Sequence, residues 1–133
     1  MPIKLNVKIK DSGTDEGYLD VDQSGNANHV PQNSQTQTIT WKLIGNAQGG
    51  TFNAMSAANP GFAWKGNQPQ YGTFGTPVPD AHGNMTMTDN NTSASSAGTW
   101  TYQLWATING QQYTTVATLN PRAVTRDPTI VNN

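Results

Sequence analysis

The chain has 133 residues, a formal charge of −1 and no cysteine, and only 11% of its residues are charged. A chain of this length predicts one domain that buries a core without the help of disulfides or metal ions. The lack of cysteine excludes a disulfide framework, cysteine-ligated metal sites and a thiol nucleophile. No apolar run approaches the ~20 residues of a membrane span. The near-neutral charge argues against nucleic acid as a partner.

Amides and hydroxyls take the place of charged groups, because the chain contains 18 Thr, 15 Asn, 10 Gln and 7 Ser. Thr is β-branched and suits strands, whereas Asn and Gly suit tight turns because they tolerate positive φ angles. The four Trp, four Tyr and three Phe residues argue against a disordered chain. The composition therefore predicts an all-β protein of short strands joined by polar turns.

The first half of the chain predicts four strands. Residues 3–10 alternate strictly between apolar and polar side chains, which is typical of a half-buried strand. In the third predicted strand, Ile39, Trp41 and Leu43 share one face. The remaining elements of this half are expected as strands at 17–22, 36–44 and 51–57, a turn at 11–14 and a loop at 25–34.

A long irregular stretch occupies residues 59–83, with four Pro and five Gly. A loop of this length inside a compact domain indicates either a hidden short strand or a functional loop. A short strand is expected next, at 85–88, followed by a polar loop at 90–97.

The clearest pattern is a hairpin over residues 99–119. Asn109-Gly110 is the dipeptide of a type I′ turn, and alternating runs flank it on both sides. A two-residue turn fixes the register of the two strands. The predicted cross-strand pairs are Ile108–Gln111, Ala106–Tyr113, Leu104–Thr115, Tyr102–Ala117 and Trp100–Leu119.

Residues 121–133 are expected to form a partly ordered tail. Ile130 and Val131 are apolar enough to dock on the domain, whereas Asn132 and Asn133 are expected to fray. The ending Asp127-Pro128-Thr129-Ile130 is similar to the C-terminus of bacterial inclusion-body proteins, a resemblance that implies no activity.

About seven short strands joined by polar turns predict an antiparallel two-sheet β-sandwich. Trp41 in the third strand and the segment Gly98 to Tyr102 resemble the core tryptophan and the tyrosine-corner segment of immunoglobulin-like domains. The two cysteines of that family are absent. The resemblance implies a single Ig-like sandwich over residues 1–133 and implies no activity.

The aromatic residues of the long stretch, Phe62, Trp64, Tyr71 and Phe74, are candidate ligand-binding residues. They stand among amides such as Asn67 and Gln68, and aromatic rings flanked by amides are typical of sugar-binding surfaces. The alternative is that the rings anchor the long loop on the core. Both interpretations stay open on the sequence alone.

Trp105 is a further candidate contact residue, because it lies on the strand face opposite to Trp100, Tyr102 and Leu104. An exposed Trp on a sheet face marks a contact patch for a partner protein. The alternative is that another segment covers it, and the apolar residues of the tail are the candidates for that role.

The candidate calcium ligands are Asp11, Asp15, Asp20, Asp22 and Ser24. The run from Asp20 to Gly25 matches the first half of an EF-hand loop, but Pro31 stands where that loop needs Glu. The alternative is cross-strand ion pairing: if the first two strands pair antiparallel, Lys8 and Lys10 lie near Asp20 and Asp22. Such exposed pairs contribute roughly 0–1 kcal/mol each.

We expect a non-catalytic binding or interaction protein without cofactors, whose partner is an unknown protein or a carbohydrate. No nucleophile elbow, phosphate loop or carboxylate dyad is recognisable, and Asp80 with His82 offers only two metal ligands. One alternative is a carbohydrate-binding module, and another is a structural protein that forms inclusions or surfaces. The composition is similar to surface-exposed or secreted, antigen-like bacterial proteins. No signal peptide is recognisable, which indicates a cytosolic protein or a mature exported form.

Overall fold

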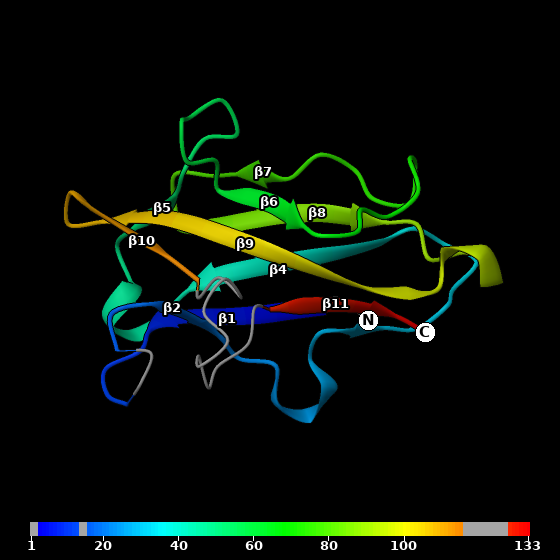
Figure 1. Cartoon of the computed structure of the whole chain (residues 1–133), viewed down its shortest axis with the longest axis horizontal. Coiled ribbons are helices and arrows are strands. Elements are labelled where there is room, and N and C mark those ends of the chain that lie inside the picture. Colours follow the sequence, from blue (N-terminus) through cyan, green and yellow to red (C-terminus); the bar gives the residue numbers. More distant parts are fainter. Residues whose placement is uncertain (1–2, 14–15, 116–127) are drawn as a thin grey trace.

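The computed structural model describes residues 3–13, 16–115 and 128–133 (Figure 1). The regular secondary structure of these residues is mostly β-strand, and no helix among them has the length and apolar character that crossing a membrane requires. The strands are β1 (Ile3–Ile9), β2 (Leu19–Val21), β3 (His29–Val30), β4 (Gln37–Leu43), β5 (Thr51–Phe52), β6 (Phe62–Lys65), β7 (Val78–Pro79), β8 (Asn84–Asp89), β9 (Gly98–Ile108), β10 (Gln111–Thr114) and β11 (Thr129–Asn132). Short 3₁₀ turns η1 (Ser24–Asn26), η2 (Gly45–Ala47) and η3 (Ala94–Ser96) connect some of them.

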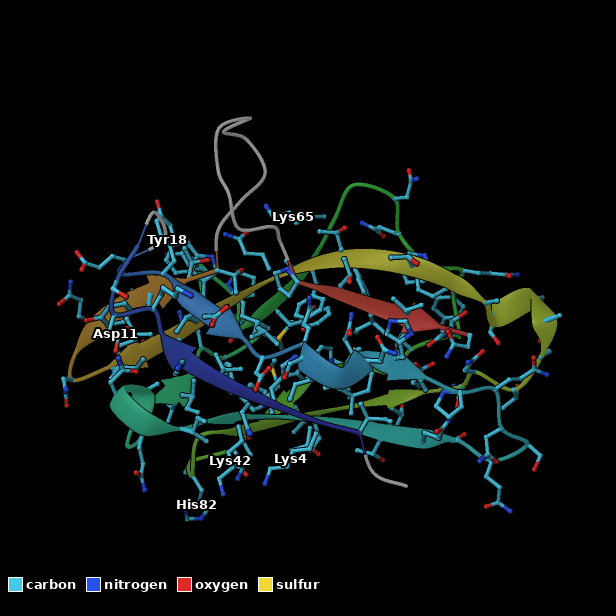
Figure 2. The ribbon with its side chains drawn as sticks, turned by 90° about the horizontal axis from the view of Figure 1, so that it is seen from below. Lys4, Asp11, Tyr18, Lys42, Lys65 and His82 are labelled. Atoms are coloured by element: carbon cyan, nitrogen blue, oxygen red, sulfur yellow. The ribbon has the colours of Figure 1, made fainter. Side chains whose placement is uncertain are left out.

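The strands form two sheets that face each other as layers (Figure 2). The first sheet has the order β2-β1-β4-β8-β7. The second is built around the long strand β9, with β10 and β11 along one edge, β5 and β6 along the other, and β3 beyond β11. The all-β two-sheet sandwich expected from the sequence is therefore confirmed. The pairing is mixed rather than wholly antiparallel, because β1 runs parallel to β4 and β3 runs parallel to β11.

The core lies between the sheets and is filled by the inward residues of the alternating strands. Trp41 of β4 and Tyr102 of β9 are both fully buried there, and the Trp41 indole Nε1–H donates to the Tyr102 hydroxyl at 2.9 Å. The sequence likeness to a tyrosine corner predicts a hydrogen bond from the hydroxyl to the backbone. In this fold the hydroxyl instead accepts from the other large core side chain, so a hydrogen bond joins the two sheets.

The first two strands pair antiparallel as expected, with Lys8 opposite Asp20. Lys10 lies opposite Tyr18 rather than near Asp22, because the Lys10 N–H donates to the Tyr18 carbonyl at 2.8 Å. Two expected elements differ in extent. The strand expected at 51–57 ends at Phe52, and the loop expected at 25–34 contains the short strand β3.

The hairpin turn is confirmed, since Asn109 and Gly110 have φ angles of 53° and 78° as a type I′ turn requires. The expected pairs of Ile108 with Gln111 and of Ala106 with Tyr113 are present, and the Thr115 N–H donates to the Leu104 carbonyl at 3.2 Å. The expected partners Ala117 and Leu119 lie outside the described residues. Toward its start, β9 has β11 along this same edge, with Trp100 opposite Ile130.

The expectation that the C-terminal residues fray is wrong. Ile130 is buried as predicted, but Asn132 is buried as well, with 2% of its surface exposed. It lies in β11, which bonds to β9 on one side and to β3 on the other. The Asn133 N–H donates to the Val30 carbonyl at 3.0 Å. Backbone pairing on both sides, together with the buried Ile130 side chain, holds this segment.

The irregular stretch at 59–83 hides two strands, β6 and β7. β6 pairs antiparallel with β9, and this pairing places Trp64 opposite Tyr102. Gly61 is required at the entry to β6, because a Cβ there would clash with the Asn53 carbonyl oxygen. The stretch is thereby fixed to the second sheet at one end and to the first sheet at the other.

Candidate functional site

A continuous series of aromatic contacts runs from the core to the surface along β6. Phe62 is buried and stacks on Tyr102, with ring centroids 5.1 Å apart and planes at 14°. Trp64 contacts the Phe62 ring edge-on at 4.8 Å. Phe74 lies 4.9 Å from Trp64 and 5.5 Å from Trp100. The inner rings are core residues, and the outer three are half-buried.

The outer end of this series borders a small hollow of about 220 Å³, here called the aromatic pocket. Tyr71 stands fully exposed at its rim, whereas Trp64 and Phe74 are half-buried beside it. None of the described residues lining it carries a charge. Lys65 projects to the outer side of the second sheet (Figure 2). The lining residues are Trp64, Gln68, Pro69, Gln70, Tyr71, Gly72 and Phe74.

The loop that carries Tyr71 is held by the end of β8. The Asn90 side-chain amide donates to the Gly72 carbonyl at 2.9 Å, and the Asn90 N–H donates to the Thr73 carbonyl at 2.7 Å. The Thr36 hydroxyl donates in turn to the Asn90 side-chain oxygen at 2.6 Å. These bonds fix the backbone on the Gly72 side of the pocket, and the pairing of β6 with β9 fixes the Trp64 side, so these two walls exist before any ligand binds.

The structure brings together three of the five candidate ligand residues, Trp64, Tyr71 and Phe74. Phe62 is a core residue, so for this ring the anchoring interpretation fits. Trp105 does not line the pocket and is half-buried on the outer face of β9. Gln70 lines the pocket but was not among the residues singled out from the sequence. The sequence feature that could have identified Gln70 is its position directly before Tyr71.

A larger apolar groove of about 640 Å³ lies between residues 51–56 and 76–81. The charged residue of its lining is Asp80. The Asp80 carboxylate accepts hydrogen bonds from the Asn84 N–H at 2.9 Å and the His82 N–H at 2.8 Å. These bonds lower the pKa of Asp80 below its usual value. Because the carboxylate is occupied by its own loop, the lining residues of the groove offer a ligand hydroxyl groups but no free charged group.

The candidate calcium residues lie around β2. Asp20 and Asp22 line a hollow of about 280 Å³ together with Lys8. The Ser24 hydroxyl and N–H donate to Asp22 at 2.6 and 3.0 Å, and these bonds, followed by the nearby charge of Lys8, lower the pKa of Asp22. Asp11 is exposed (Figure 2).

Asp15, the remaining candidate calcium residue, lies outside the described residues. Within the part of the chain that the structure describes, no three acidic or histidine side chains gather as a metal site. An ammonium group in the hollow and an Asp22 that is bonded by its own turn favour charge pairing over calcium binding at this place.

A comparison of the sequence with protein-family models and with curated proteins finds no match. What the chain binds is therefore inferred from the geometry of its own residues.

Proposed function

We propose that the chain is a non-catalytic binding domain whose aromatic pocket takes a neutral carbohydrate. The observation that carries this proposal is the fully exposed ring of Tyr71 beside Trp64, with Gln68 and Gln70 at the same hollow. Sugar rings have apolar C–H faces that pack on aromatic rings. Their hydroxyls match side-chain amides, which both donate and accept hydrogen bonds.

The size and charge of the pocket narrow the ligand. Its volume of about 220 Å³ lies below the roughly 300–1,000 Å³ of pockets that hold drug-sized molecules, so a single sugar ring is the matching unit. The uncharged lining favours a neutral sugar over a uronic or sialic acid. The lining residues include no pair of carboxylates, which glycoside hydrolysis needs, and this supports binding without catalysis.

The proposed scaffold for this site is an immunoglobulin-like sandwich. The buried Trp41 of β4 and the aromatic Tyr102 of the long strand support that likeness. The parallel pairing of β1 with β4 departs from the wholly antiparallel sheets of that family. The likeness is therefore proposed at the level of the sandwich and its core.

The test is a panel of neutral oligosaccharides, followed by titration of the intrinsic Trp fluorescence at sugar concentrations up to tens of millimolar. Tyr71→Ala is expected to weaken binding by tenfold or more, about 1.4 kcal/mol, and to leave the melting temperature unchanged, because the ring is fully exposed. Tyr18→Ala is the matched control, since it removes another exposed tyrosine that lies outside the pocket. Binding that survives Tyr71→Ala, or the absence of binding by every neutral sugar, would contradict the proposal.

A further inference from the structure

A buried polar cluster joins the end of β8 to the C-terminal strand. It consists of Asp89, Asn91, Ser96 and Asn132, all of which are buried. The Asn132 amide donates to Asp89 Oδ1 at 3.0 Å and to the Ser96 carbonyl at 3.0 Å. The Ser96 hydroxyl donates to Asn91 Oδ1 at 2.8 Å. β11 is thus held by side chains as well as by its backbone.

Two oxygens of this cluster have no donor. They are Asp89 Oδ2 and Asn132 Oδ1, and they belong to the same Asp–Asn pair. The two residues already share one hydrogen bond through their other side-chain atoms. A buried acceptor without a partner costs free energy, and a native fold rarely leaves two of them in adjacent residues.

The groups around Asp89 are neutral on every element packed against it. Gln37 of β4 is its cross-strand partner, and Phe74 pairs with it on the other side. On β3, Val30 lies opposite Asn132, so the one titratable residue of that strand, His29, lies on the other face. No cation therefore compensates an ionised Asp89 among these neighbours, and burial raises the pKa of Asp89 to about 6 against the opposing effect of the Asn132 hydrogen bond.

A metal ion does not account for the two oxygens. Calcium takes six to eight oxygen ligands, and this pair offers two. A proton does account for them, because a protonated Asp89 Oδ2 is a donor and Asn132 Oδ1 is an acceptor for it.

We propose that Asp89 is protonated in the folded protein and that its Oδ2–H donates to Asn132 Oδ1. The pair is then a cyclic carboxylic acid–amide dimer with two hydrogen bonds, and every side-chain atom of both residues is satisfied. At a pH between the ordinary Asp value of 3.8 and about 6, the proton is taken from solvent on folding and returns to solvent on unfolding. The docking of β11 onto β9 and β3 is consequently sensitive to pH, independently of what the aromatic pocket binds.

The test is an NMR titration of the Asp89 side-chain carboxyl carbon in the full chain, which needs no variant. The expected result is a titration near pH 6, compared with 3.8 for an unperturbed Asp. Ionisation of Asp89 below pH 4.5 would overturn the proposal, because the second hydrogen bond then does not exist at the pH at which the protein is folded.

Asp89→Asn gives an independent readout. An amide at this position donates to Asn132 Oδ1 and accepts from the Asn132 amide, so it reproduces the neutral acid. The variant is expected to fold and to lose the fall in melting temperature that the wild type shows between pH 4 and pH 7. Asp20→Asn removes one carboxylate elsewhere and is expected to keep that fall. A wild-type pH profile in Asp89→Asn, or a variant that melts far below the wild type at pH 4, would refute the shared proton.

Discussion

Tyr102→Phe removes one buried atom and so tests how the two sheets are joined. The Tyr102 hydroxyl accepts the hydrogen bond of the Trp41 indole N–H, at 2.9 Å, and both side chains are 0% exposed. Burial also raises the pKa of Tyr102, so the phenol stays neutral at any working pH. Without the hydroxyl, the indole N–H is buried with no acceptor, which costs about 1–3 kcal/mol.

For a chain of this size, 1 kcal/mol corresponds to roughly 4 °C in melting temperature, so the expected loss is roughly 4–12 °C. Urea unfolding monitored by circular dichroism is expected to show a lower midpoint with an unchanged slope. Tyr18→Phe is the control, since it removes the same atom from an exposed ring and is expected to change stability by less than about 0.5 kcal/mol. If Tyr102→Phe unfolds like the control, the hydrogen bond does not contribute to joining the sheets and the reasoning fails.

Three further predictions concern other parts of the fold. The raised pKa of Asp89 implies that its protonation contributes about 3 kcal/mol to the free energy of unfolding, in full below pH 4 and no longer once the pH has risen through 6. Urea unfolding of the wild type and of Asp89→Asn at pH 4 and pH 7 measures this contribution, and the same pH dependence in both proteins would exclude it. Gly61→Ala forces a Cβ against the Asn53 carbonyl and is expected to cost about 1–3 kcal/mol in thermal unfolding, whereas an unchanged melting temperature would mean that β6 shifts freely. Gly110→Ala places an L-residue at φ 78° and is expected to cost about 1 kcal/mol, with a stable variant arguing against the type I′ turn.

Local patterns were sufficient to predict the long strands. Strict alternation identified β1, and the Asn109-Gly110 turn fixed the register of β9 against β10 as far as Thr115. These features depend on residues that are neighbours in the chain, so period and turn chemistry determine them.

The partners of distant strands could not be predicted in the same way. Nothing in the alternation of residues 3–10 specifies a parallel neighbour at 37–43, because a parallel pairing leaves no turn between the two strands. Asn132 shows the same limit for burial. An Asn near the end of a sequence is typical of a fraying tail, but here its side chain bonds to Asp89 of the facing sheet and to the Ser96 carbonyl, and it is buried.

Sequence patterns indicated which residues belong to the candidate site but not how these residues are arranged in space. The aromatic residues of the long stretch could be recognised as candidates by residue type. How deeply each ring is buried depends on β6, a strand that is hard to recognise in a sequence stretch so rich in Gly and Pro. Within β6, Phe62 and Trp64 share the inward face, but Phe62 is buried against Trp41 and Tyr102 whereas Trp64 is half-buried against Phe74. Sequence spacing does not contain these contacts, because they come from distant parts of the chain.

Anchoring and ligand binding were two competing interpretations of the aromatic residues on the sequence alone. The fold favours anchoring for Phe62 and Phe74, and the proposed sugar binding relies on Tyr71. Phe62 is a core ring that packs against Trp64, and Phe74 packs between Trp64 and Trp100. Trp64 and Phe74 line the pocket as a floor held by other aromatic side chains, whereas Tyr71 contributes its whole exposed ring at the rim. A preformed floor lowers the entropic cost of binding. A hexose has about 12 non-hydrogen atoms, and at about −0.3 kcal/mol per atom it gains about −4 kcal/mol, which is a Kd near 1 mM. A single aromatic pocket of this kind is therefore expected to bind one sugar ring weakly, and tight attachment to a glycan would require several copies of the domain or of the sugar within reach of each other.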